Sequence, residues 1–298
     1  MSAPLVSIIT INYNESKVTL ALLASLRNLS YQNVEIIVVD NASPNDHPKI
    51  LKEHYPEITL IESSKNLGFA GGNNLGIKAA KGAYYLFINN DTIVPENFIE
   101  PLVNTLEKDP AIGMVSPKIK FHWDESLIQY AGYTPMNHWT IRNHSIGYHS
   151  KDDGTYDIAG ETASIHGAAM MVPRHVVDKV GMMTEIYFLY YEEHDWAAKI
   201  KRAGYKIYYQ PASYILHKES ISTGKFSPLK TYYISRNRLL YARRNFKPIH
   251  LLVSILFQCL VSIPKNTIVF IVKREFTHLK AFWNAIIWNL THHQIIHQ

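Results

Sequence analysis

The chain has 298 residues, of which 47% are hydrophobic and 18% charged, and its formal net charge is +5. This composition is typical of a globular protein of one large domain or two small ones, and it excludes disordered, collagen-like and coiled-coil chains. The single Cys259 cannot form an internal disulfide, and no basic and then apolar run follows Met1, so we expect a cytoplasmic protein.

The first hundred residues alternate strand-like and helix-like segments. We expect strands at 5–11, 34–39, 58–62 and 83–88, and helices at 16–29, 47–55 and 73–80. This repeated order predicts the α/β class, with a largely parallel sheet and helices on both faces. Ligands bind such sheets beyond the carboxyl ends of the strands. Polar clusters lie at three of those ends, at 12–15, 40–43 and 89–91.

Beyond residue 110 the pattern is less regular. Strand-like segments occupy 112–116, 164–172 and 213–216, and we expect helices at 175–180 and 192–203. Residues 121–150 are rich in His, Trp, Tyr and Asn but have no clear period, so no element is assigned to them.

Two acidic residues at strand ends are candidates for ligand binding. Asp40 is placed to accept hydrogen bonds from a base or a ribose, although a turn-capping role explains it equally well. Asp91, with Asn89 and Asn90 before it, offers the oxygen ligands that Mg²⁺ and Mn²⁺ prefer, and an Asx turn is the alternative. The four glycines of 66–76 let the backbone approach an anionic ligand, yet they form neither a dinucleotide fingerprint nor a P-loop.

Glu192, Glu193 and Asp195 form a carboxyl cluster at the start of a predicted helix. Neighbouring carboxyl groups either repel, which raises at least one pKa, or share a cation or a substrate hydroxyl, so this cluster is a candidate general base. Acidic residues also stabilise a helix N-terminus, and the sequence does not separate the two roles. His217 and the arginines after it, among them Arg236, suit a metal or a diphosphate.

The C-terminal third is basic and apolar. Residues 1–198 contain 14 Lys and Arg and 23 Asp and Glu, whereas residues 199–298 contain 16 and 2. Such a segment favours an anionic partner, and its long apolar runs favour an anionic membrane surface over nucleic acid. Because Pro264 and Lys265 interrupt the apolar runs, we expect helices that lie in the interface rather than a transmembrane segment. A buried helical hairpin or a dimer contact is the alternative.

In chain order, the polar motifs are IITINYN at 8–14, VVDNAS at 38–43, NLGFAGGNNLG at 66–76, NNDT at 89–92, HGAAM at 166–170, YYEEHDW at 190–196, and His217 with STG at 222–224. The ordered set resembles the family 2 inverting glycosyltransferases of the GT-A fold, specifically their bacterial rhamnosyltransferase-like branch. The resemblance implies a GT-A catalytic domain at 1–245, with a mostly parallel Rossmann-like sheet, and a C-terminal helical extension at 246–298.

The resemblance also implies roles for individual residues. The nucleotide site is expected to contain Tyr13, Asn14, Glu15, Asp40, Asn66, Gly71 and Asn90. The ligands of the divalent metal, Mg²⁺ or Mn²⁺, are expected to be Asp91 and His217, with Asn89 in place of the family's first Asp. The expected base is Glu193, with Asp195 as the second candidate, and contacts to the acceptor or the diphosphate are expected from Glu192, Gly167, Trp196 and Arg236.

The implied function is an inverting, metal-assisted single displacement in cell-surface polysaccharide synthesis. The donor is expected to be dTDP-rhamnose or a UDP-hexose, and the acceptor a glycan or a polyprenyl-linked glycan at the inner face of the cell membrane. A sugar-nucleotide pyrophosphorylase is disfavoured because residues 5–17 lack a basic, glycine-rich triphosphate loop. A non-catalytic nucleotide-binding or nucleic-acid-binding protein of the same fold is the other alternative. We expect no nucleic-acid partner, because no zinc-knuckle or RNA-recognition motif is present. The sequence leaves the oligomeric state open.

Overall fold

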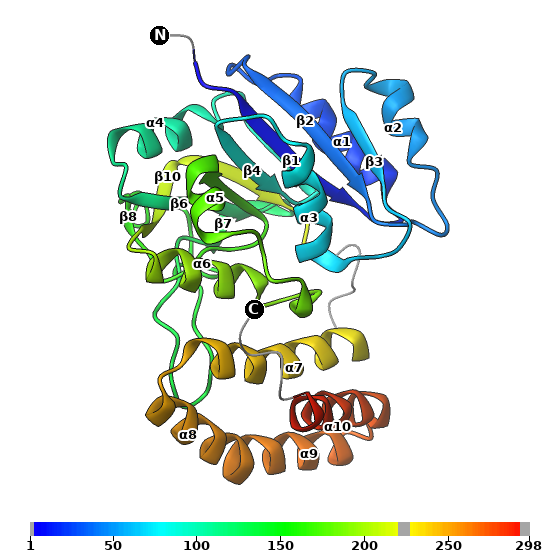
Figure 1. Cartoon of the computed structure of the whole chain (residues 1–298), viewed down its shortest axis with the longest axis vertical. Coiled ribbons are helices and arrows are strands. Elements are labelled where there is room, and N and C mark those ends of the chain that lie inside the picture. The colour runs from blue at the N-terminus through cyan, green and yellow to red at the C-terminus, as the bar shows by residue number, and fades with distance from the viewer. Residues whose placement is uncertain (1–2, 220–226, 293–298) are drawn as a thin grey trace.

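The chain forms an α/β body with a layer of C-terminal helices at one end, as seen in the computed structural model (Figure 1). The structure describes residues 3–219 and 227–292, so the predicted motif at 222–224 lies outside the described residues. The strands of the described part are β1 Val6–Asn12, β2 Val34–Asp40, β3 Thr59–Glu62, β4 Tyr84–Ile88, β5 Thr92–Ile93, β6 Ile112–Phe121, β7 Asp124–Tyr130, β8 Gly160–Glu161, β9 Ala169–Pro173 and β10 Lys206–His217. They form a mixed sheet in the order β3-β2-β1-β4-β9-β6-β10-β5, with β7 beside β6 and β8 beside β10.

Helices cover both faces of this sheet. They are α1 Ser16–Leu26, α2 Lys49–His54, α3 Gly68–Ala79, α4 Glu100–Lys108, α5 Arg174–Val180 and α6 Glu192–Arg202. One face packs on α1, α2 and α4, and the other on α3, α5 and α6. In β1, Val6 and Ile8 belong to the first core and Ile9 to the second, which explains why apolar side chains occur on both faces of this strand.

The predicted parallel pairing is confirmed for β1 to β4 and for β6 with β10, but it does not hold for β9. Strands β1 to β4 pair in parallel, whereas β9 runs antiparallel to both β4 and β6. Strand β9 follows a long excursion at 131–168 instead of a single crossover helix, and so it can enter the sheet in the opposite direction. The structure also places β7 inside the segment 121–150 to which the sequence assigned no element.

Two elements begin well before the residues that the sequence predicts. Helix α3 begins at Gly68, whose φ of +68° makes the turn into the helix five residues earlier than expected. Strand β10 begins at Lys206, but its register against β6 shifts between Gln210 and Tyr214, where Pro211 lies. This irregularity hides the first half of the strand from a search for alternating residues.

The C-terminal layer consists of α7 Pro228–Asn245, α8 Pro248–Phe257, the π-helical segment Gln258–Ser262, α9 Ile263–Val272 and α10 Phe276–Thr291. Helix α7 lies between the α/β body and the other helices, with α6 on one side and α10 on the other (Figure 1).

Helix Pro248–Val272 is continuous, which corrects the expected interruption at Pro264 and Lys265. The π-helical turn directly before Pro264 widens the helix and makes room for the proline ring. The helix has 25 residues, mean hydropathy 1.8 and 6% of its most apolar window buried, so by length and composition it is able to cross a membrane. The buried-hairpin alternative therefore does not describe this helix, whereas α10 does pack against α7.

Candidate active site

The carboxyl ends of β1, β2 and β4 open into a cavity of about 420 Å³. The pairing of Asn12 with Asp40 aligns the ends of β1 and β2, and β4 pairs with β1 on the other side. The walls are completed by the loops before β9 and α6 and by the end of β10. The predicted site residues that line this cavity are Tyr13, Asn66, Asn90, Asp91, Gly167, Glu192, Glu193 and His217.

One wall is fixed by Asn41, to which the sequence analysis gave no role. Its Nδ2 donates to Asn66 Oδ1 at 3.0 Å and to the carbonyl of Gly68 at 2.9 Å, and its Oδ1 accepts from the Leu67 amide. These bonds hold the turn at 66–68 against the end of β2. The signal was present in the sequence, because Asn41 directly follows Asp40 in the same turn.

Asp91 and His217 form a buried pair on the opposite wall. Their Oδ1 and Nε2 atoms lie 3.2 Å apart, and His217 Nδ1 lies 2.8 Å from Gln129 Oε1. The Gln129 oxygen can only accept, so the imidazole proton is assigned to Nδ1, and the Nε2 lone pair points toward a carboxylate oxygen. A carboxylate oxygen and an imidazole nitrogen placed in this way can both coordinate one cation. Among the described residues, no group of three or more His, Cys, Asp or Glu side chains is placed to hold a metal ion.

Glu192 and Glu193 begin α6 and line the cavity beside each other. Each has an Oε2 atom that is buried and has no hydrogen-bond partner among the described residues. Burial, and after it the charge of Glu193, raise the pKa of Glu192 well above its ordinary value. This shift favours the uncharged form of Glu192, which reduces the repulsion between the two groups.

A strained loop positions these carboxyl groups. Phe188, Tyr190 and Tyr191 all have positive φ, which non-glycine residues rarely adopt. Asn237 of α7 compensates for this strain, because its Nδ2 lies within 2.7–2.9 Å of the carbonyl oxygens of Tyr187, Leu189 and Tyr190. Arg236 supports the same loop by donating to the carbonyl of Tyr187 at 2.7 Å. Arg236 is thus a buried support of the loop and does not line the cavity.

Aromatic and imidazole groups surround the carboxyl pair. His194 Nε2 lies 3.8 Å from Glu193 Oε1, and its Nδ1 shares a hydrogen bond of 2.7 Å with Ser164 Oγ. Burial lowers the pKa of His194, and the charge of Glu193 opposes this shift. Burial, and after it the charge of His217, lowers the pKa of His166 to about 3, so this imidazole in the cavity is neutral. Tyr133 lies in the segment without a period, where no local signal marked it.

Asp195 and Trp196 do not reach the cavity. Asp195 is 1% exposed and accepts hydrogen bonds from Thr184 Oγ1, Tyr187 Oη and Asn245 Nδ2, and it forms an ion pair with Arg244 at 3.1 Å. Trp196 donates to the carbonyl of Gly181 and packs edge-on against Phe87 in the core. These two residues therefore hold α6 in place. The sequence predicted both in the site, but the structure does not place them in the cavity.

Four expected nucleotide contacts also lie outside this cavity. Asp40 lines a neighbouring cavity and accepts hydrogen bonds from Asn12 and Ser43. Asn14 and Glu15 form the turn before α1, where the Asn14 side chain accepts from the amide of residue 45. Gly71 lies inside α3, and a side chain there would meet Leu67 rather than a ligand.

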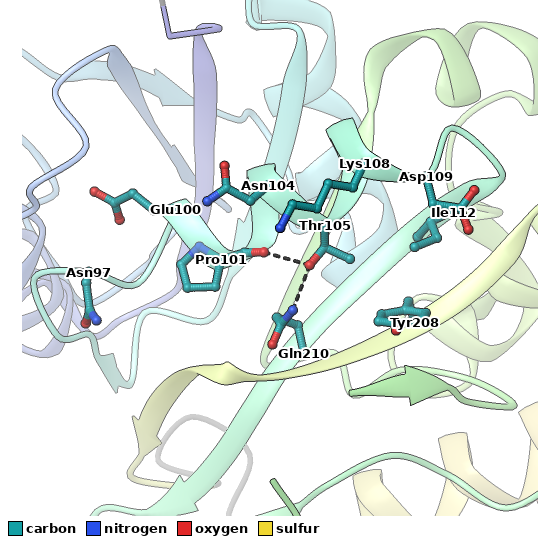
Figure 2. A pocket seen from close by; sticks show the side chains of 10 residues that line it. All are labelled: Asn97, Glu100, Pro101, Asn104, Thr105, Lys108, Asp109, Ile112, Tyr208 and Gln210. Carbon is teal, nitrogen blue, oxygen red and sulfur yellow. Dashed lines mark hydrogen bonds between the residues drawn. The ribbon is translucent and has the colours of Figure 1, made fainter. Parts of the chain in front are cut away.

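A separate cavity lies beside α4 and β10 (Figure 2). Its central side chains bond to one another: Gln210 Nε2 donates to Thr105 Oγ1, which donates to the carbonyl of Pro101. None of the predicted site residues lines it.

The sheet order, the helices on both faces and the polar cavity at the carboxyl edge are those of the GT-A fold. The chain belongs to the family described as Glycosyl transferase family 2, which it matches over residues 7–170. The expected family and fold are confirmed, and the protein is a glycosyltransferase of the hexosyltransferase class.

Similar proteins agree with this assignment. The low-salt glycan biosynthesis hexosyltransferase Agl10 of Haloferax volcanii is 26% identical over 80% of this chain and 76% of its own length. The N-acetylglucosaminyl-diphospho-decaprenol L-rhamnosyltransferase of Mycobacterium tuberculosis is 23% identical over 73% of this chain and 77% of its own. Among solved structures, the mannosyltransferase PcManGT from Pyrobaculum calidifontis, in complex with GDP-Man and Mn²⁺, has a TM-score of 0.59 at 17% identity and covers 98% of this chain and 88% of that one.

Proposed function

We propose that the protein transfers a sugar from a nucleoside diphosphate donor to a glycan or lipid-linked glycan, with inversion at the anomeric carbon. The proposal depends on one observation: Asp91, His217 and Glu193 line the same cavity at the carboxyl edge of the sheet. A single displacement needs a group that stabilises the leaving diphosphate and a base that takes the proton of the acceptor hydroxyl. Glu193 can supply the base, and Asp91 and His217 would supply ligands for a metal ion that stabilises the diphosphate.

Asp91 and His217 are the residues that would hold a divalent metal, Mg²⁺ or Mn²⁺. Two protein ligands leave positions for water and for phosphate oxygens, which suits an ion shared with a diphosphate. When bound, the ion neutralises the negative charge that develops on the leaving nucleoside diphosphate. Gln129 holds the His217 ring so that Nε2 faces Asp91 Oδ1.

Glu193 is the proposed base, and burial favours the uncharged form of its neighbour Glu192. The strained loop before α6 fixes the direction of the Glu193 side chain, and Asn237 holds that loop. On the donor side, Tyr13, Asn66 and Asn90 are the proposed nucleotide contacts. Asp40 is retained as a nucleotide contact through the neighbouring cavity, which it shares with Ser43.

We further propose that the acceptor is lipid-linked and that residues 246–298 rest on the anionic inner face of the cell membrane, with residues 1–245 as the catalytic domain. Helix Pro248–Val272 exposes apolar side chains such as Leu252 and Leu260, and Lys273 and Arg274 follow it. An apolar face flanked by cations is typical of a helix in the membrane interface. The mycobacterial relative, named for a diphospho-decaprenol acceptor, supports a lipid-linked substrate here.

The donor site is tested by isothermal titration with dTDP, UDP and GDP, each with and without Mn²⁺. We expect one nucleotide to bind in a metal-dependent manner, and Asp91→Asn to abolish that binding. The matched control is Asp178→Asn, on the exposed surface of α5, which leaves binding unchanged. If no nucleotide binds to the native protein with Mn²⁺, the proposed transfer reaction is refuted.

The membrane proposal has its own test, flotation with vesicles of phosphatidylcholine alone or with phosphatidylglycerol. We expect the native protein to float with the anionic vesicles and Leu260→Asp to float much less, because Leu260 is 74% exposed on the apolar helix. A native protein that stays at the bottom of the gradient with both vesicles contradicts the membrane location.

A further inference from the structure

Two arginine side chains on the segments next to Glu192 and Glu193 have no acidic partner among the described residues. Arg238 lies on α7, and its Nε donates to Tyr191 Oη at 3.3 Å. Arg142 lies in the loop between β7 and β8. The other arginines of α7 are engaged: Arg236 with loop carbonyls, Arg243 with Asn289, and Arg244 with Asp195.

The burial of Ile141 brings the two arginines together. Ile141 is fully buried in a small core between α6 and α7, and Tyr191 Oη donates to its carbonyl at 2.9 Å. The same tyrosine hydroxyl therefore contacts Arg238 and the residue before Arg142. The proximity of Arg238, and after it burial, lower the pKa of Arg142. The two positive charges therefore repel each other, and no acidic side chain among the described residues forms an ion pair with either, so an anion bound to both would stabilise the pair.

The arginine pair lies between the proposed base and the apolar helix. On one side, the Tyr191 ring is 5.5 Å from the ring of His194, which neighbours Glu193. On the other side, the loop that carries Arg142 descends toward α8 (Figure 1). In that loop, the His138 ring stacks on His250 of α8 at 3.8 Å.

We propose that Arg142 and Arg238 bind the phosphate or diphosphate group of a lipid-linked acceptor. The guanidinium planes match phosphate oxygens in a bidentate manner, and two of them suit a diphosphate. In this arrangement the acceptor sugar reaches Glu193, one tyrosine side chain away, and the lipid runs along helix Pro248–Val272. The inference rests on the proposed transferase function and extends it to the acceptor.

The test uses inorganic pyrophosphate and farnesyl diphosphate as probes, titrated in EDTA so that metal-dependent binding at the donor site is removed. We expect Arg142→Gln and Arg238→Gln each to weaken farnesyl diphosphate binding by about tenfold, and the double variant to abolish it. Arg174→Gln is the matched control, because this exposed arginine lies on α5 away from the cavity. Unchanged affinity in the double variant overturns the proposal.

Two further measurements separate the possible sources of the phosphate and the two proposals. If the double variant keeps farnesyl diphosphate binding but loses binding to phosphatidylglycerol vesicles, the pair recognises membrane headgroups and the acceptor site is refuted. The double variant is expected to bind the donor nucleotide with Mn²⁺ as the native protein does. If the native protein binds the nucleotide with Mn²⁺ but its diphosphate binding does not depend on the two arginines, only the acceptor site is refuted. If diphosphate binding depends on the arginines but no nucleotide binds with Mn²⁺, the donor reaction is refuted.

Discussion

Replacing Asp195 distinguishes the two carboxyl groups that the sequence offered as the base. Asp195 is buried, with four donors around it, and Arg244 at 3.1 Å supplies the compensating charge. The Asp195→Asn substitution removes the negative charge that faces the buried Arg244 guanidinium. Breaking a buried ion pair in this way destabilises proteins by roughly 3–5 kcal/mol. For a chain of this length, we expect the Tm to fall by roughly 5–8 °C.

Replacing Glu193 is expected to have the opposite effects, a small change in Tm and a large loss of activity. Its side chain is 15% exposed, and its Oε2 has no hydrogen-bond partner among the described residues. Glu193→Gln keeps the shape of the side chain, so we expect a change in Tm below about 2 °C. Loss of a general base lowers kcat by roughly 10²–10⁴-fold.

The assay measures release of nucleoside diphosphate well below both Tm values, with the donor and acceptor that the native enzyme turns over, and thermal unfolding of the same samples. Asp195→Asn is expected to keep kcat within a few-fold of the native enzyme while losing stability. An Asp195→Asn enzyme with native Tm and lost turnover, beside an active Glu193→Gln enzyme, refutes the assignment of the two carboxyl groups.

Two predictions concern the fold around the site. Gly68→Ala is expected to cost roughly 1–3 kcal/mol and to lower activity, because φ is +68° and a Cβ would lie 2.1 Å from the Phe188 carbonyl oxygen; Gly160→Ala, with open space around it, serves as the control in thermal unfolding. Burial alone would raise the pKa of Asp152, but hydrogen bonds from Lys118 and a second lysine lower it. The stability from this carboxylate is therefore complete above its ordinary pKa and is lost as the pH falls through the lowered value. Asp152→Asn should be less stable at pH 7 by about 1–3 kcal/mol and lose less stability between pH 5 and 3; an unchanged slope contradicts the ion pair.

Local patterns were sufficient to predict the first half of the sheet and its functional edge. Apolar runs and turn residues mark β1, β2 and β4, and the parallel arrangement brings Tyr13, Asn66 and Asp91 to one edge. The roles of Glu193 and Asp195 were also separable in principle. Each residue of a helix is rotated by about 100° from the one before it, so residues two apart point to nearly opposite sides. In α6, one side chain faces the cavity and the other faces α7.

Contacts that depend on distant segments had no local signal. Gln129 meets His217 although β6 lies between their two strands, and the carbonyl before Arg142 meets Tyr191, which Arg238 also contacts, because Ile141 is buried beside α7. The π-helical turn before Pro264 was equally invisible, since nothing in its composition differs from an α-helix.

The support of the strained loop by α7 has a consequence for how the enzyme can be dissected. Asn289 of α10 donates to the carbonyl of Arg236, and the Trp288 ring lies 4.7 Å from the Arg236 guanidinium. The chain of contacts from the last helix thus ends at the loop that precedes Glu192. A fragment that stops at residue 245 would contain every side chain of the cavity. It would lack α10, which contacts Arg236 behind the strained loop. The C-terminal helices therefore support the loop that carries the carboxyl pair, whatever surface they also contact.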